Sequence, residues 1–243
     1  RSSDLVKAAA DIGISKFRLT GGEPLIRKGI IDLVNSISKH SGVMDLGLTT
    51  NGVLLSQYAY PLKKAGLDRV NISIDSLDAK KYEKITRGGK LSNVLEGIRA
   101  AKEVKLTPLK LNIVLIGGFN DNEIEDFVNL TINEDIEVRF IELMPLGEAS
   151  DWDKSHFIPN TEVLKRIPAL KSLSFKGPGG IARYYKLANS KGKVGLISPL
   201  SNHFCEYCNR IRITPDGKLK PCLHSNKELD IKEYINKDIK SFL

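Results

Sequence analysis

The stretch that decides the fold is Lys16-Phe17-Arg18-Leu19-Thr20-Gly21-Gly22-Glu23-Pro24. A short β-rich run ends in paired glycines, and apolar residues then recur at intervals of three and four over 26–38, which is helical spacing. Paired glycines after a strand let a ligand approach the backbone closely. The stretch therefore predicts a strand–loop–helix unit of an α/β protein, with a ligand-binding loop at the carboxyl end of the strand.

The same pattern repeats along the first part of the chain. The β-rich runs lie at 16–20, 45–49, 69–74, 110–116 and 137–143. The helical segments between them lie at 26–38, 54–65, 91–104 and 123–132. Runs that are continuously apolar as often as alternating are typical of a parallel sheet covered by helices. Strands that alternate with helices over short connections predict either an open doubly wound sheet or a TIM-like barrel.

The texture of the sequence changes after Pro145. We expect a polar, irregular stretch at 145–160 and a short helix at 161–167. Short β-like pieces between Gly/Pro turns follow at 170–197, and a last helix at 231–242. Asp216-Gly217 lies between two β-rich pieces and predicts a hairpin. We expect an α/β core over residues 1–144 and a C-terminal extension over 145–243 that packs on it.

The composition excludes several classes of protein. With 243 residues, 41% of them apolar, the chain can form one ordinary core and is not a disordered polypeptide. Its apolar runs fall far short of the ~20 residues of a membrane-spanning helix, and it starts without a secretory signal pattern. The net charge of +8 is spread along the chain without a basic run, and aromatic residues make up 7%. We therefore expect a solvated basic surface or a phosphate-bearing substrate, and neither nucleic acid nor membrane as a partner.

The three cysteines form the sharpest motif. Cys205-x-x-Cys208 is followed, after thirteen residues, by Cys222. The two-residue spacing lets both thiolates of one tight loop face a metal, and a hairpin would return the third thiolate to it. An odd cysteine count argues against a disulfide framework and indicates a reducing compartment, so we expect the cytoplasm. Two sites fit this set: a zinc ion completed by His203 or His224, and an iron–sulfur cluster with one open iron.

Basic residues in or near strands indicate an anion site. Arg210 and Arg212 lie two residues apart, so on a strand both guanidinium groups would project to one side, beside the cysteines. Guanidinium groups match phosphate oxygens. Arg18 and Lys110 belong to predicted barrel strands, where burial without an anionic partner is costly. An exposed strand face with two surface arginines is the alternative explanation.

Other polar groups follow the predicted strands, at 49–52, at Ser73 and at Glu142. The carboxyl ends of the strands form the functional face of a barrel. A hydrolase is not indicated, because His40 at a helix end and His156 in a polar loop cannot be combined with a nucleophile and an acid.

Several of these segments carry a family resemblance. Residues 16–24, Leu48-Thr49-Thr50-Asn51-Gly52 and Asn71-Ile72-Ser73-Ile74-Asp75-Ser76-Leu77 resemble successive strands of radical S-adenosylmethionine (SAM) enzymes. More narrowly, Arg139-Phe140-Ile141-Glu142-Leu143-Met144 and the cysteine set with Arg210-Ile211-Arg212 resemble the GTP 3′,8-cyclases of molybdenum-cofactor biosynthesis. The resemblance covers essentially the whole chain in register. It implies an incomplete TIM-like (radical SAM) barrel and a C-terminal extension that carries an auxiliary iron–sulfur cluster.

The resemblance also implies the site, residue by residue. The residues that would contact SAM are Gly22, Ser73 and Met144. The residues that would hold GTP are Arg18, Thr49, Lys110, Arg210 and Arg212. The ligands of a second four-iron cluster, whose open iron meets the guanine, would be Cys205, Cys208 and Cys222. No side chain of this chain is expected to be catalytic, since in that family a 5′-deoxyadenosyl radical from SAM removes hydrogen from the ribose C3′ of GTP, and the ribose radical attacks C8.

Further expectations concern partners and completeness. The resemblance implies a low-potential electron donor and a downstream cyclic pyranopterin monophosphate synthase; the oligomeric state is left open, with a homodimer as one candidate. In the family, the cluster that cleaves SAM is bound by the three cysteines of a Cys-x₃-Cys-x₂-Cys loop, which precedes the strand at residues 16–20. This loop and a glycine-terminated tail are not in the sequence, so we expect an internal fragment that is inactive alone.

Two other hypotheses stay open at this point. One is a different radical SAM enzyme with an auxiliary cluster, such as a peptide-modifying enzyme, which would not need Lys110, Arg210 and Arg212 in one pocket. The other is a non-enzymatic binding protein with a structural zinc knuckle, which would contain zinc and no iron.

Overall fold

The computed structural model describes residues 2–145, 147, 154–174, 181–223, 225 and 227–231. Its main sheet has eight strands in the order β1-β2-β3-β4-β5-β8-β7-β6. These strands are β1 Lys16–Leu19, β2 Asp45–Thr50, β3 Arg69–Ser73, β4 Leu109–Leu115, β5 Ile136–Glu142, β6 Lys171–Ser172, β7 Arg183–Lys186 and β8 Lys193–Ile197. The helices are α1 Ser2–Asp11, α2 Ile30–Ser38, α3 Leu55–Lys64, α4 Ala79–Ile85, α5 Leu91–Glu103, α6 Ile124–Asn133 and α7 Thr161–Arg166. A small second sheet contains β9 Arg212–Ile213, β10 Lys218–Lys220 and β11 Leu229–Asp230.

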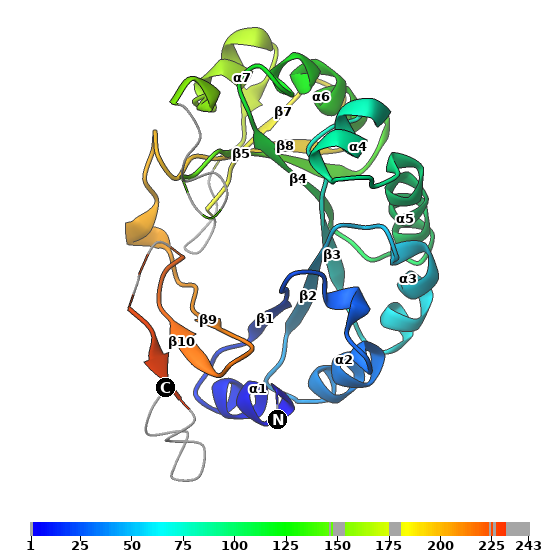
Figure 1. The fold of residues 1–243 in the computed structure, drawn as a ribbon, viewed down its shortest axis with the longest axis vertical. Helices are drawn as coiled ribbons and strands as arrows, with labels where there is room; N and C mark the ends of the chain where they lie inside the picture. Colours follow the sequence, from blue (N-terminus) through cyan, green and yellow to red (C-terminus); the bar gives the residue numbers. More distant parts are fainter. Residues whose placement is uncertain are drawn as a thin grey trace.

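The main sheet is curved like part of a barrel. Strands β1 to β5 and β8 pair in parallel and form an arc, with the helices on its outer side (Figure 1). Within the described residues the arc does not close, because β1 pairs with β2 alone. The hairpin of β9 and β10 lies across the open side, close to β1 in the view of Figure 1. The expected fold, an incomplete α/β barrel, is confirmed.

The predicted elements are largely confirmed. Each of the five predicted strands is present, with ends that differ by no more than one residue. The helix expected from residue 26 begins instead at Ile30, because a 3-10 turn at Pro24–Ile26 and left-handed Gly29 come first. Helix α4 was not predicted: it is lysine-rich, and Tyr82 is its one buried residue, so no apolar face marks it in the sequence.

The C-terminal extension continues the main sheet. Strand β8 pairs in parallel with β5, from Glu137 opposite Lys193 to Ile141 opposite Ile197. Strands β7 and β6 then add to β8 in the antiparallel sense. The predicted hairpin is confirmed, with Ile213 opposite Leu219 and Gly217 in the left-handed conformation of its turn. The last predicted helix and His224 lie outside the described residues.

The two faces of the sheet differ in chemistry. On β4, Leu109, Leu111, Ile113 and Leu115 are fully buried against the helices. The alternate residues Lys110, Asn112 and Val114 are half-buried and belong to the other, concave face. The apolar core therefore lies between sheet and helices, which leaves the concave face for polar side chains. Within the described residues, no helix is both long and apolar enough to span a bilayer.

Candidate active site

The loop after β1 is held to the end of β2 by Glu23. Its carboxylate accepts hydrogen bonds from Thr50 Oγ1 and the Asn51 N–H, both at 2.7 Å, and from the Leu25 N–H at 3.0 Å. Gly22, beside it, is exposed, and a Cβ built there meets nothing within 4 Å. The loop thus has a fixed shape and a backbone that a ligand can reach.

The residues expected to contact SAM follow three different strands of the parallel sheet. Gly22 lies beyond β1, Ser73 is the exposed last residue of β3, and half-buried Met144 follows β5. Because carboxyl ends of parallel strands share one edge of a sheet, all three lie at the same end of the barrel. Their contact with SAM stays a prediction.

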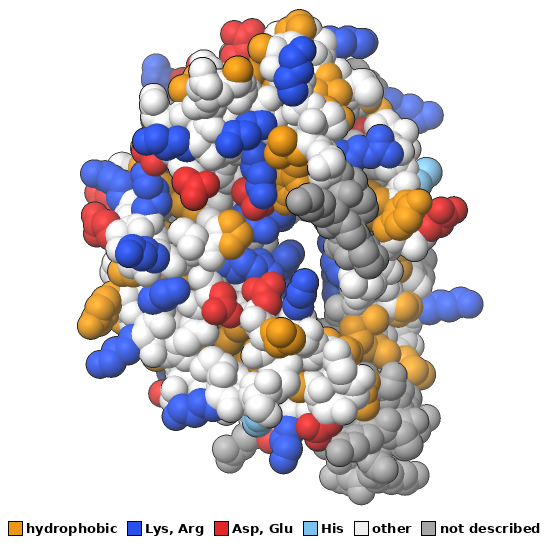
Figure 2. Space-filling view, turned by 180° about the vertical axis from the view of Figure 1, so that it is seen from behind, with side chains coloured by type: hydrophobic (Ala, Val, Ile, Leu, Met, Phe, Trp, Pro, Cys, Tyr) orange, Lys and Arg blue, Asp and Glu red, His pale blue; other side chains and the backbone are white. Residues whose placement is uncertain are grey.

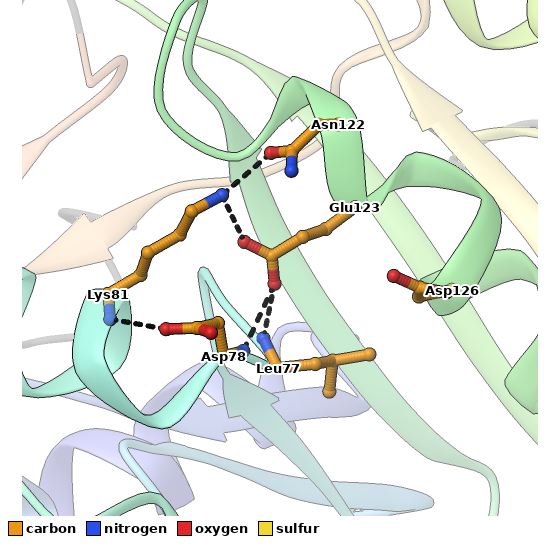
Figure 3. A pocket seen from close by; sticks show the side chains of 6 residues that line it. All are labelled: Leu77, Asp78, Lys81, Asn122, Glu123 and Asp126. Carbon is orange, nitrogen blue, oxygen red and sulfur yellow. Dashed lines mark hydrogen bonds and ion pairs between the residues drawn. The ribbon is translucent and has the colours of Figure 1, made fainter.

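A polar hollow at the same end is satisfied from within the chain. Lys81 Nζ donates to Asn122 Oδ1 at 2.6 Å and pairs with Glu123 at 3.0 Å, and Glu123 accepts from the Leu77 N–H at 2.6 Å (Figure 3). Asp78 caps α4 by accepting from the Lys81 N–H at 2.8 Å. These bonds fix the segment after Ser73 to the start of α6.

The strand register gathers polar residues in layers on the concave face. Thr49, Asn71, Lys110, Glu137 and Lys193 are direct neighbours across β2, β3, β4, β5 and β8. The next layer is formed by Ser73, Asn112, Arg139, Gly195 and Tyr184, and the preceding one by Arg18, Gly47 and Arg69. Paired residues on neighbouring strands point to the same side of a sheet. Figure 2 shows Lys and Arg side chains gathered around the central opening of the molecule.

The cations of this face exceed its carboxylates. Arg69 forms a two-bond pair with Asp45, at 2.8 and 2.7 Å. Glu137 is shared, at 3.3 Å from Lys110 Nζ, 2.9 Å from Arg139 Nη2 and 3.0 Å from Lys193 Nζ. Among the described residues, three buried guanidinium nitrogens have no hydrogen-bond partner: Arg69 Nη1, Arg139 Nε and Arg210 Nε. Unpaired donors and surplus positive charge together fit an anionic ligand.

Burial and repulsion from neighbouring cations lower the pKa values of Arg18 and Lys110. Burial, with repulsion from Arg69, Arg139 and Arg210, lowers the pKa of Arg18 to about 10, while Asp45 acts in the opposite direction. Burial is also the main cause that lowers the pKa of Lys110 to about 8. Charge that is costly in the free protein is stabilised when an anion binds.

The extension brings Arg210, one of its two predicted GTP-binding arginines, to this face. Arg210 is close enough to Arg18 on β1 to lower its pKa, and its guanidinium carbon lies 5.8 Å from the centre of the Phe204 ring. Arg212 is half-buried on β9, opposite Lys220. The structure thus joins Arg210 to the barrel cations, whereas convergence of Arg212 with Lys110 stays a prediction.

The cysteines have suitable chemistry for a metal, but the structure does not assemble them. All three are free and exposed, and the Cys208 N–H donates to the Cys205 carbonyl at 3.1 Å within one turn. Burial alone would raise the pKa of Cys208, but hydrogen bonds and charge from Arg210, with charge from Arg212, outweigh it and lower the pKa. In the described part of the chain, no three Cys, His, Asp or Glu side chains form a group that could hold a metal ion. The cluster therefore stays a prediction.

Sequence reasoning missed part of the polar face. The sequence pattern did not indicate a role in the site for Glu137, Tyr184 or Lys193. It also did not predict the ion pair between Arg69 and Asp45. The available signal was alternation: Glu137 and Arg139 interrupt an apolar strand at a spacing of two, which places both on one face.

Comparison with known proteins defines the class. The family model "Radical SAM superfamily" matches residues 3–131, and the model "Molybdenum Cofactor Synthesis C" matches residues 136–241. Among solved structures, Streptococcus suis SuiB bound to S-adenosylmethionine superposes with a TM-score of 0.66 at 15% identity, over 96% of this chain and 56% of that chain. The chain therefore has the radical SAM fold, followed by a molybdenum-cofactor-synthesis region.

Curated relatives narrow the assignment. The GTP 3′,8-cyclase of Alkaliphilus oremlandii is 57% identical over 94% of this chain and 71% of its own length. The GTP 3′,8-cyclases of Alkaliphilus metalliredigens and Peptoclostridium acidaminophilum are 56% and 55% identical, over 93% and 94% of this chain and 71% and 70% of their own lengths. The chain belongs to the GTP 3′,8-cyclase family.

Proposed function

We propose that the protein converts GTP to (8S)-3′,8-cyclo-7,8-dihydroguanosine 5′-triphosphate in molybdenum cofactor biosynthesis. The observation that carries this proposal is the concave face, with its excess of cations and its unpaired guanidinium nitrogens. A triphosphate supplies the negative charge and acceptor oxygens that this face lacks. Membership in an enzyme family also argues against the non-enzymatic zinc-knuckle hypothesis.

In this proposal the two parts of the chain have different tasks. Residues 1–144 bind SAM through Gly22, Ser73 and Met144. Residues 145–243 supply Cys205, Cys208 and Cys222 as ligands of an auxiliary four-iron cluster. The expected GTP ligands come from both parts: Arg18, Thr49, Lys110, Arg210 and Arg212.

The residues of the chain hold and orient the substrate. Arg18, Lys110 and Arg210 bind phosphate oxygens, and Thr49 is held beside them by a 3.4 Å hydrogen bond from Asn71 Nδ2. When bound, SAM would supply the radical that removes hydrogen from the ribose, at a first cluster whose Cys-x₃-Cys-x₂-Cys ligands are not in this sequence. The barrel wall contributes orientation and the exclusion of water. A low-potential electron donor and a downstream cyclic pyranopterin monophosphate synthase complete the proposal, with the reaction in the cytoplasm.

Calorimetric titration with GTP tests the proposal. Each charged contact to a phosphate contributes about 1.5–3 kcal/mol. We expect Lys110→Ala, Arg210→Ala and Arg212→Ala each to weaken GTP binding roughly ten- to a hundredfold, at ~1.4 kcal/mol per factor of ten. In a version of the protein that includes the Cys-x₃-Cys-x₂-Cys loop, SAM binding should remain nearly unchanged.

The matched control is Lys102→Ala, on the outer surface of α5. It should alter neither affinity. Unchanged GTP affinity in all three test variants would overturn the GTP assignment. One zinc ion per chain, with no iron after anaerobic purification, would overturn the auxiliary cluster.

A further inference from the structure

Glu137 is the hub of the polar face. Its carboxylate is almost fully buried and pairs with the Lys110, Arg139 and Lys193 side chains at 3.3, 2.9 and 3.0 Å. The Tyr184 hydroxyl donates a fourth contact to it, at 2.8 Å. Burial alone would raise the pKa of Glu137, but these neighbours outweigh it and lower the pKa to about 2. The carboxylate is therefore ionised at any physiological pH.

The fold builds this hub from two distant parts of the chain. Pairing of β8 with β5 puts Lys193 beside Glu137, and pairing of β7 with β8 puts Tyr184 beside Gly195. A Cβ at Gly195 would lie 3.1 Å from Tyr184 Cε1, so the absence of a side chain there lets the ring lie against the sheet. The ring centre lies 4.5 Å from Lys193 Nζ and 5.6 Å from the Arg139 guanidinium carbon.

We propose that Glu137, oriented by Tyr184, is a positioning residue that keeps Lys110 protonated and directed into the concave face until the nucleotide triphosphate takes its place as counter-ion. This inference rests on the function proposed above. The Glu137 carboxylate carries one negative charge, whereas the three side chains paired with it carry three positive charges. The face therefore still attracts an anion, although each of these three cations has a partner. A triphosphate carries more charge than the carboxylate and can draw Lys110 away from it.

The surroundings of Lys110 support this role. The other cations described on the face are Arg18 on β1, Arg69 on β3, Arg139 on β5, Lys193 on β8 and Arg210 of the extension, and Asp45 on β2 pairs with Arg69. Tyr184 on β7 stays protonated because burial raises its pKa to about 12. Burial and repulsion from Arg139 and Arg69 lower the pKa of Lys110 to about 8, and attraction to Glu137 opposes them. Glu137 is therefore the group that keeps the amine charged near neutral pH.

The first test needs no nucleotide. Competitive labelling of the Lys110 amine with an acylating reagent, read by mass spectrometry across pH, gives its pKa in the intact protein. Glu137→Gln should lower that pKa by about 1–3 pH units, the effect of an opposite charge within ~4–6 Å. Tyr184→Phe, which keeps every charge, should lower it by a smaller amount. Glu134→Gln, the same change at a half-exposed carboxylate paired with Lys102, should leave it unchanged.

The second test follows GTP binding by calorimetry between pH 6 and pH 9. Relative to the unchanged protein, Glu137→Gln should bind GTP more and more weakly as pH rises, because its Lys110 loses the proton at lower pH. The ratio of the two affinities should widen by roughly five- to fiftyfold between pH 6 and pH 8. A purely structural defect would weaken binding equally at every pH. If Glu137→Gln does not fold, the smaller decrease in the Lys110 pKa that we expect in Tyr184→Phe tests the positioning role.

The outcomes separate the two proposals. An unchanged Lys110 pKa in both the Glu137 and Tyr184 variants, or parallel pH profiles, would overturn the positioning role while GTP binding stands. Absence of GTP binding by the unchanged protein at every pH would overturn the proposed function, and with it the exchange of counter-ions, even if the Lys110 pKa responds.

Discussion

Glu142→Ala tests how the extension is attached to the barrel. Glu142, at the end of β5, is fully buried and accepts hydrogen bonds from the N–H groups of Asn160, Leu200 and Ser201 at 3.0, 3.1 and 3.0 Å, and from the Ser201 hydroxyl. A single carboxylate thus fixes two segments of the extension, including the one that leads to Cys205. Alanine leaves these donors buried without an acceptor.

The expected loss follows from those donors. Breaking a buried charged network costs about 3–5 kcal/mol, less than the sum of its bonds because the site relaxes. At about 2–4 °C per kcal/mol for a chain of this size, Tm should fall by roughly 6–20 °C. Thermal unfolding followed by circular dichroism measures it. Glu162→Ala, at a surface carboxylate paired with Arg166, is the control and should cost less than about 0.5 kcal/mol. Equal Tm values for the two variants would refute the reasoning.

Three further predictions concern packing, acid and metal. Gly97→Ala should destabilise the protein by about 1–3 kcal/mol in urea unfolding, because the added Cβ would collide with the Gly52 carbonyl oxygen where α5 meets α3; a gain in stability would contradict this packing. The folded-state pKa of Glu137 lies below its unfolded value, so its contribution to stability is present above pH 4.5 and is lost as pH falls toward about 2; Glu137→Gln should flatten that part of the stability profile, and an unaltered profile would be evidence against it. His203→Ala and His224→Ala should each leave the iron and sulfide content of the reconstituted protein unchanged, whereas loss of metal in either variant would favour a zinc site closed by histidine.

Local patterns were sufficient for the barrel strands. The predicted β-rich runs span five to seven residues each, and they already placed Arg18 and Lys110 on barrel strands. The structure confirms both placements. Helix α4 could not be predicted from an apolar face, because Tyr82 is the one residue of this helix that is buried in the core. Asp78 before it is nevertheless a good N-cap signal.

Contacts between distant segments were beyond sequence reasoning. Nothing local in residues 193–197 shows that they pair in parallel with β5 rather than form a separate sheet. The Glu137–Tyr184 contact spans 47 residues and depends on that pairing. By the same logic the SAM contacts, the position of Arg212 and the cysteine cluster depend on ligands and long-range placement, so they remain predictions.

The parallel pairing of β5 with β8 has a consequence for how the polypeptide can be cut. Strand β5 is buried along almost its whole length, between β4 on one side and β8 on the other. In a polypeptide that ends near residue 144, the backbone groups of β5 that normally pair with β8 would be exposed beside Val138 and Phe140. Glu137 would also lose its contacts with Lys193 and Tyr184. Such an apolar, unpaired edge is a template for association with other chains. The two regions that match separate family models therefore both contribute strands to one sheet. Expression of residues 1–144 alone should yield aggregates rather than a smaller barrel.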